Sequence, residues 1–146
     1  MAFIHVKGPA KTEGFQKLAS TLIAAGALVS FAISGRISQA LVQSTRIAGI
    51  SLKKVASTDD DYADTTVIPV IIPSEDDVFE VPVSGTAAQA NVGFAYDLTA
   101  VAAGTSQAVN LSGITYKTVT VVKFINSSTV WVKINGNYAF ANKTLL

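Results

Sequence analysis

The sequence predicts an all-β fold, a small barrel or sandwich, with an extended N-terminal arm and at most one short helix. Three observations support this class. Apolar and polar residues alternate with a period of two along most of the chain after residue 27. Turn residues separate these runs at the spacing typical of sandwiches and barrels. β-branched and aromatic residues, which favour strands, are frequent in a chain of 146 residues, long enough for one domain with a core.

The first 26 residues are expected to form an N-terminal arm that precedes a β-rich body over residues 27–146. Residues 1–14 contain two glycines and a proline and show no sustained periodicity, which favours an extended chain. Residues 15–25 carry apolar side chains at helical spacing, so the one short helix is expected there, with an apolar face made by Phe15, Leu18, Leu22 and Ile23.

The body is expected to begin with a hairpin and a bulged strand. Residues 29–33 alternate apolar and polar side chains, a two-residue turn is expected to start at Gly35, and residues 37–43 are expected to form the return strand. Residues 45–55 follow as a strand in which Gly49 shifts the alternation, and this shift predicts a bulge.

Strands are expected to continue to the end of the body. Residues 65–72 form an apolar run that Pro69 interrupts. Because proline cannot donate to a strand ladder, Pro69 should lie at a sheet edge or a bulge. The strongest hairpin signal joins residues 116–126 to residues 129–135. Shorter strands are predicted over residues 79–84, 92–98 and 109–111.

Charge is distributed in three blocks. Residues 1–58 hold seven bases and one acid, residues 59–97 hold nine acids, and residues 98–146 hold four bases, so the net charge of +1 conceals a pattern of +6, −9 and +4. The acids either lie on solvated loops or meet basic residues of neighbouring subunits and set their register. The second interpretation assigns inter-subunit electrostatic contacts to two clusters: Asp59, Asp60, Asp61 and Asp64, and Glu75, Asp76, Asp77 and Glu80.

The residue types that enzymes need are sparse. The chain has no cysteine, which excludes disulfides and cysteine-ligated metals, and its only histidine, His5, lies in the expected arm without rigid support. Paired carboxylates could hydrolyse glycosides, but a single tryptophan offers no aromatic sugar cleft. Calcium is an alternative for the acidic clusters, although they lack the spacing and central glycine of a calcium-binding loop. We therefore predict no enzymatic activity, no catalytic or metal-binding residues and no cofactor.

Membranes and nucleic acids are not favoured as partners either. Residues 18–35 form an uncharged run near the minimum length of a bilayer span, but serine, threonine and glycine residues interrupt it. The basic residues are neither clustered nor interleaved with aromatics, as nucleic-acid binding would require. Trp131 faces away from the apolar side of its strand, so it is expected either in a core buried on both faces or as an anchor in an interface.

Two segments resemble the small β-rich head decoration, or cement, proteins of tailed bacteriophages. Residues 26–56 begin with a glycine-led apolar strand and contain an Ile-Ala-Gly-Ile step at 47–50, and residues 66–85 end in Val-Pro-Val-Ser-Gly. The resemblance covers the central part of the chain and does not include the hairpin region over 116–140. It implies a β-barrel or β-tulip body with an arm.

The resemblance also implies a function. Such a protein is a structural virion protein that binds the major capsid protein, or another virion protein, on the outer face of the head and stabilises the shell, often as a homotrimer. A charged fraction of 14%, against about 25% in an average protein, agrees with a surface that a partner covers. The alternatives are a phage tail, connector or fibre component and a carbohydrate-binding adhesion module. In the arm, five residues are expected on the partner: Phe3, Ile4, Val6, Lys7 and Lys11.

Overall fold

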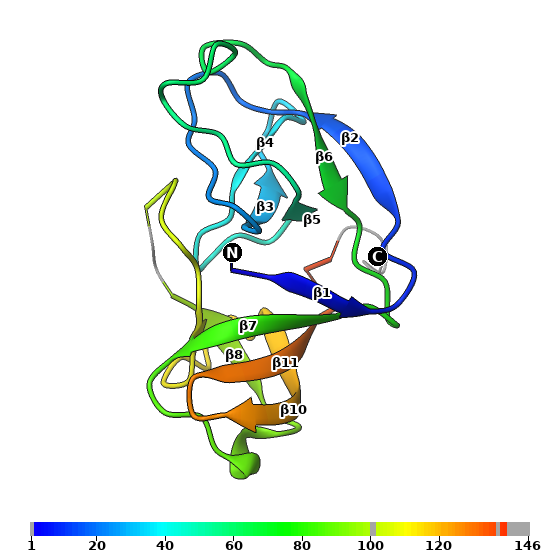
Figure 1. Ribbon diagram of the computed structural model, residues 1–146, viewed down its shortest axis with the longest axis vertical. Helices are drawn as coiled ribbons and strands as arrows, with labels where there is room; N and C mark the ends of the chain where they lie inside the picture. The colour runs from blue at the N-terminus through cyan, green and yellow to red at the C-terminus, as the bar shows by residue number, and fades with distance from the viewer. Residues whose placement is uncertain (1, 100–101, 137, 140–146) are drawn as a thin grey trace.

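The computed structural model describes residues 2–99, 102–136 and 138–139, which form two β-sheets stacked along the long axis of the molecule (Figure 1). One sheet has the strand order β2-β6-β5-β3-β4, and the other has the order β1-β7-β11-β10-β8-β9. The strands are β1 (Ile4–Lys7), β2 (Thr12–Gln16), β3 (Leu28–Phe31), β4 (Ile37–Gln39), β5 (Ile47–Ser51), β6 (Val67–Ile71), β7 (Val78–Ser84), β8 (Ala95–Leu98), β9 (Val109–Asn110), β10 (Val119–Asn126) and β11 (Thr129–Ile134).

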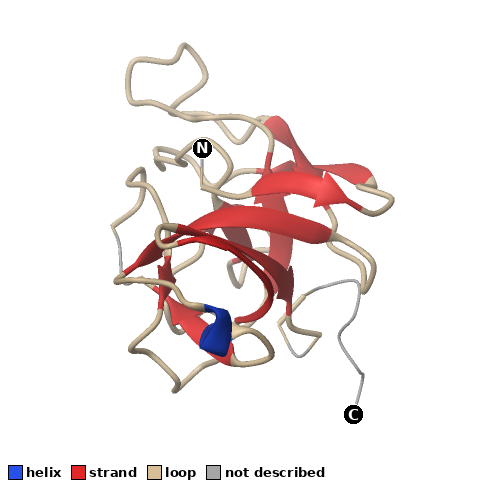
Figure 2. Ribbon diagram, turned by 60° about the horizontal axis from the view of Figure 1, so that its bottom comes forward, coloured by secondary structure: helices blue, strands red, loops and turns tan. Residues whose placement is uncertain are grey.

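The lower sheet in Figure 1 closes into a five-stranded barrel. Strand β7 pairs antiparallel with β11 and parallel with β9, while β10 joins β11 to β8 and β8 joins β9. Strand β1 adds to β7 beside this ring. The predicted all-β class with a small barrel is thus confirmed. Figure 2 shows that strands supply nearly all the regular structure, and the 3-10 turn η1 (Gln89–Asn91) is the only helical segment in the described residues.

The β2–β6 sheet, made of strands β2 to β6, also curls on itself. Lys17, just after β2, forms a parallel bridge with Ile37 of β4, and the Leu18 N–H donates to the Ile37 carbonyl at 2.9 Å. The two outer strands of the sheet therefore meet, and they enclose a core of their own. This core contains the fully buried side chains of Ile23, Val29, Ile37, Ile68 and Val70.

A second and larger core lies inside the barrel and continues into the β2–β6 sheet. In β11 the apolar positions of the alternating pattern, Val130, Val132 and Ile134, all point into it. The same cluster includes Leu28 and Ile50 from the other sheet. Because burial of apolar surface is the main favourable term in folding, this shared cluster joins the two sheets into one body.

The local signals of the body are largely confirmed. Strands β10 and β11 form the predicted hairpin, and the β3–β5 register shifts next to Gly49, as the predicted bulge requires. The β3–β4 turn is longer than expected, since Ala32 N–H donates to the Arg36 carbonyl and Gly35, at φ +80°, closes a three-residue loop. A third residue lets the turn follow the strand twist with one left-handed glycine.

Pro69 does not lie at a sheet edge, contrary to expectation. Strand β6 is flanked by β2 and β5, with Pro69 opposite Gly14 of β2. Neither ladder of β6 shows a register shift at Pro69, so the expected bulge is absent as well. The paired residues of β5 and β6 end at Ser51 and Val70, and just beyond them the Leu52 N–H still donates to the Pro69 carbonyl at 3.0 Å. The proline therefore removes only the reciprocal hydrogen bond at the end of this ladder, and this explains how an inner strand accommodates it.

The N-terminal expectations are wrong in two respects. Residues 4–7 and 12–16 are strands within the two sheets rather than a loose arm, and the described residues contain no α-helix over 15–25. Pairing with β7 and β6 satisfies the backbone of these segments, so tertiary contacts override the short local stripe. Residues 140–146, the end of the expected body, lie outside the described residues.

Candidate functional site

The only histidine has a structural role. His5 Nε2 lies 2.9 Å from Oδ1 of Asp77, a fully buried carboxylate that also accepts hydrogen bonds from the N–H groups of Ala10 and Ser74. Burial would raise the pKa of Asp77, but the backbone donors, His5 and the Ser74 hydroxyl outweigh it and hold this pKa below its usual value. The cluster ties the β1–β2 connection to the start of β7.

Acid should remove the stabilisation that Asp77 provides. Because its pKa is lower in the folded than in the unfolded chain, the stabilisation is complete above about pH 4 and is lost as the pH falls through the folded value. Asp77→Asn should therefore lower the free energy of unfolding at neutral pH, and its difference from wild type should shrink in acid. Urea unfolding across this pH range measures the effect, and a difference that stays constant with pH would contradict it.

The residues expected to tether the chain to a partner differ in accessibility. Phe3 is only 1% exposed, and its ring packs edge-on against Phe79 with centroids 6.3 Å apart, so its assignment to a partner is wrong. The apolar contact is made within the chain because Phe79 offers a core position beside β1. For the accessible residues a partner contact stays a prediction: Ile4, Val6, Lys7 and Lys11.

The two acidic clusters lie in different parts of the molecule. The first occupies the acidic loop, residues 57–64, at the far end of the β2–β6 sheet, and the second borders the start of β7 (Figure 1). Asp77 is buried and bonded within the chain, so the inter-subunit contact expected of it is wrong. For the accessible members an inter-subunit contact stays a prediction: Asp59, Asp60, Asp61, Asp64, Glu75, Asp76 and Glu80.

The acidic loop is held from beneath by a buried lysine. Lys17 is fully buried, and its ammonium donates to the carbonyl oxygens of Tyr62 at 3.0 Å and Asp64 at 2.6 Å. Thr66 and Lys53 bind the Asp61 carboxylate and hold its pKa below the usual value. A buried cation is tolerated only with such partners, so Lys17 fixes the shape of the loop.

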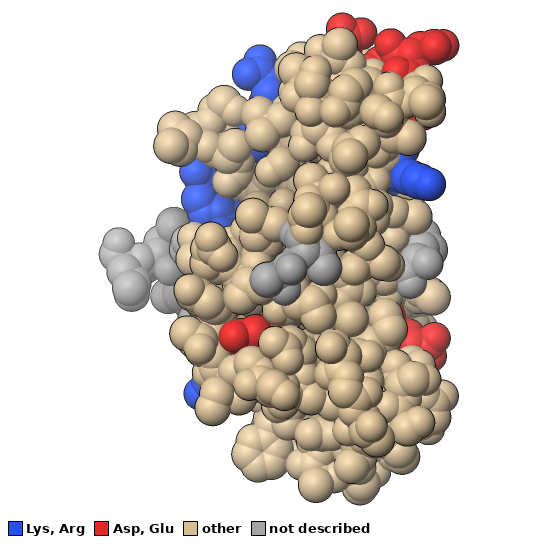
Figure 3. Space-filling view, turned by 90° about the vertical axis from the view of Figure 1, so that its left-hand side faces the viewer, with Lys and Arg blue, Asp and Glu red and all other residues tan. Residues whose placement is uncertain are grey.

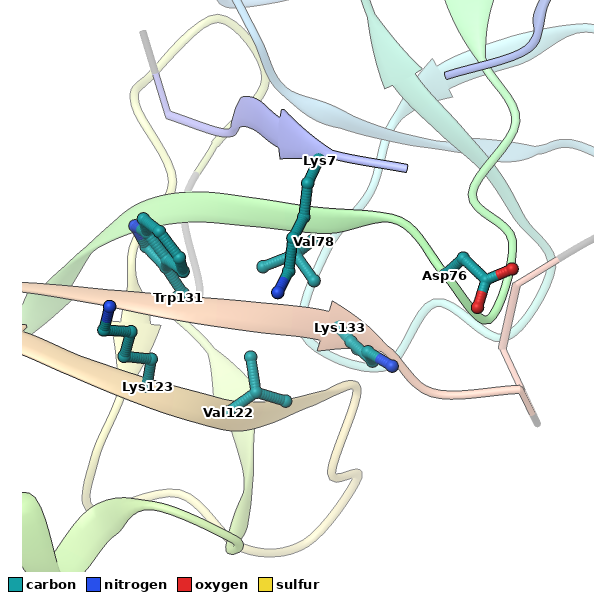
Figure 4. A pocket seen from close by; sticks show the side chains of 7 residues that line it. All are labelled: Lys7, Asp76, Val78, Val122, Lys123, Trp131 and Lys133. Carbon is teal, nitrogen blue, oxygen red and sulfur yellow. The ribbon is translucent and has the colours of Figure 1, made fainter. Parts of the chain in front are cut away.

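A groove with three lysines crosses the outer face of the barrel and forms a hollow of about 460 Å³. Figure 4 shows Lys7 reaching over from β1, Lys123 rising from β10 and Lys133 lying on β11. Trp131 forms one wall of the groove. The Lys123 ammonium lies 4.7 Å from the centre of the Trp131 ring, and the Trp131 indole N–H donates to Glu80 at 3.2 Å. We call this hollow, with Asp76, Val78 and Val122 as its remaining lining, the lysine groove.

Trp131 is therefore not part of a core that is buried on both faces of the strand, and its role as an interface anchor stays a prediction. It lies half-buried on the outside of the barrel, with a lysine over one face. The sequence placed it opposite the apolar side of β11, which is confirmed, but it did not indicate the lysines around it. Lys7 and Lys123 come from opposite ends of the chain and meet only because β1, β7, β11 and β10 are neighbours.

An apolar patch lies at the start of β8, beside the loop that precedes β10. Phe94 and Ile114 are 62% and 63% exposed, and with Ala95, Tyr96 and Lys117 they line a shallow hollow. The lowest part of the molecule in Figure 3 shows no charged side chain on the visible face. Exposing large aromatic and branched side chains to water is unfavourable in free energy, so such a patch is typical of a contact surface.

The loop that presents Ile114 is held by a residue that sequence reasoning missed. Asp97, 4% exposed, accepts hydrogen bonds from the N–H groups of Thr115, Tyr116 and Lys117 at 2.6–3.2 Å. These hydrogen bonds keep Lys117 at φ +55°, a backbone conformation that lysine rarely adopts. An acidic residue inside an apolar strand was the only available signal for this role.

The described residues show no further chemical centre. Among them no three His, Cys, Asp or Glu side chains gather in a way that could hold a metal ion. No helix in this part of the chain has the length and apolar character that crossing a bilayer would require. No protein-family model matches the chain, and no curated protein matches it significantly.

Proposed function

We propose that this chain is a non-enzymatic structural protein that attaches to an assembled protein shell, as the head decoration proteins of tailed bacteriophages do. The observation that carries the proposal is the apolar patch, where Phe94 and Ile114 remain 62% and 63% exposed on an otherwise well-buried barrel. Burial of such side chains against a second protein provides binding energy without any catalytic group.

The resemblance to decoration proteins supports the choice of partner. The resembling residues 26–56 contain β3, β4 and β5, and residues 66–85 contain β6 and β7. These strands build most of the β2–β6 sheet and one strand of the barrel, so the likeness includes segments that form the sheets. The proposed partner is the major capsid protein or another virion protein on the outer face of the head, with the chain acting as a homo-oligomer, a trimer by the same resemblance.

The low charge of the chain supports a role in protein contact. Charged residues make up 14% of the sequence, and exposed large apolar side chains occur on both sheets, including Val67 of β6 and Ile4 of β1. His5 and Asp77 are bonded to each other inside the fold, so the only histidine is used for stability. These features favour binding over acid–base chemistry.

Replacing two residues of the apolar patch should weaken attachment. Phe94→Ser/Ile114→Ser removes the exposed apolar side chains without touching a buried one, so the fold should persist while affinity for heads assembled without the chain falls about tenfold or more. Co-sedimentation of the purified chain with such heads measures the binding. Thermal unfolding of the variant shows whether its fold is intact.

The matched control is Ile33→Ser/Val67→Ser, which removes two exposed apolar side chains of the β2–β6 sheet. This control should bind as the wild type does. The proposal would be refuted if the wild-type chain did not bind the heads, or if the patch variant bound them as tightly as the wild type does.

A further inference from the structure

The lysine groove contains positive charge that the chain itself does not neutralise. No ion pair among the described residues uses Lys7, Lys123 or Lys133, and the Lys123 ammonium lies over the Trp131 ring. The lining holds three lysines and one carboxylate, Asp76, for a net charge of +2, and Glu75 borders the adjoining hollow beside Lys133. Such a groove favours an anionic occupant with carboxylates spaced across it.

A nucleic acid fits this groove poorly. Single strands bind through bases that stack on successive aromatic rings, but Trp131 is the only aromatic residue in the lining, and Lys123 covers one face of its ring. The Trp131 N–H also donates to Glu80 and is therefore not available to a base. A protein segment with carboxylates is the better match.

The chain carries such a segment at the opposite end of the molecule. The acidic loop, residues 57–64, holds four aspartates, and no hydrogen bond or ion pair among the described residues uses the carboxylates of Asp60 and Asp64. Both residues are exposed. Figure 3 shows acidic side chains gathered at the upper end, over the β2–β6 sheet.

We propose that the acidic loop of a second copy of this chain binds in the lysine groove, with Asp60 and Asp64 facing Lys7 and Lys133. The loop is suited to this because Lys17 and the Tyr62–Ser20 hydrogen bonds hold its shape before binding, which reduces the ordering cost. Charge complementarity selects the register of the two copies.

The contact is head-to-tail. In Figure 1 the acidic loop lies at the far end of the β2–β6 sheet, whereas the lysine groove lies on the barrel strands, so each copy gives a loop to one neighbour and a groove to another. A contact between two different surfaces closes as a ring when the rotation permits and otherwise grows as a chain. The wild type should therefore self-associate, more strongly at low salt.

Charge reversal on either side tests the contact. Lys7→Glu/Lys133→Glu makes the groove acidic, and Asp60→Lys/Asp64→Lys makes the loop basic; each variant alone should remain monomeric because its loop and groove then have the same sign of charge. Mixed together, the two variants should associate, since each loop meets a groove of opposite charge. Sedimentation velocity at 20 mM and 300 mM NaCl gives the masses.

The matched control is Arg46→Glu/Lys54→Glu, which reverses two exposed basic residues outside the groove. This control should associate like the wild type, and higher salt should weaken the association of the control and of the wild type. Neutralising one groove lysine should weaken association roughly fivefold. A wild type that is monomeric at low salt, association that both charge-reversed variants retain, or a mixture that stays monomeric would overturn the inference. Binding of an oligonucleotide by a monomeric wild type would do the same.

These measurements contain no phage heads. A result that overturns the head-to-tail contact would therefore not test head attachment through Phe94 and Ile114. In the same way, a result that refutes head attachment would not change the outcome of the mixing experiment.

Discussion

Gly49→Ala is expected to destabilise the chain by about 4 kcal/mol or to prevent folding. Gly49 adopts φ +154° in β5, and a Cβ there would lie 1.8 Å from the carbonyl oxygen of Ile71 in the neighbouring strand. The backbone of β6 would have to move away, and its pairs with Ile50 and Ser51 would break. Thermal and urea unfolding measure the change.

Gly35→Ala is the matched control for this prediction. Gly35 also has a positive φ, of +80°, but a Cβ there meets no atom within 4 Å. Only the left-handed conformation is then unfavourable, and about 1 kcal/mol is expected. Equal losses in the two variants would show that backbone conformation, rather than the close approach of β5 to β6, makes glycine necessary at position 49.

Asp97→Ala should be the next most damaging change and should cost about 3 kcal/mol. It leaves the N–H groups of Thr115, Tyr116 and Lys117 without their acceptor and releases Lys117 from an unfavourable φ. The loop that presents Ile114 would lose its anchor. The variant should therefore weaken head attachment as well as stability.

Two variants calibrate this effect. Asp97→Asn keeps one oxygen for two of the three donors, so it should lose about half as much stability as the alanine variant. Asp60→Ala removes an exposed carboxylate that holds no described group, and its effect should stay within about 0.5 kcal/mol. An alanine variant of Asp97 as stable as Asp60→Ala would show that water replaces the carboxylate at no cost.

The sequence by itself determined the secondary structure of the body. The alternation at Val130, Val132 and Ile134 identified a strand with one buried face, and the shift at Gly49 identified a bulge. Such patterns are local, because side chains in a strand alternate between two faces whatever its partner is. A solvated loop for the acidic residues could be predicted on other local grounds, because a run of aspartates between strands favours exposure to water or to cations.

Only the tertiary structure decided which strands meet. The barrel closes through the parallel pairing of β7 with the two-residue strand β9, and no local pattern specifies that partner. Residues 4–7 and 12–16 become strands because edges of β7 and β6 are available to them, although the sequence predicts an unpaired extended arm and the start of a helix there. The burial of Lys17 and the gathering of Lys7, Lys123 and Lys133 depend on the same long-range pairing. Their positions follow from the backbone hydrogen bonds and the shared core that bring distant segments together, and periodicity along the chain contains no information about those contacts.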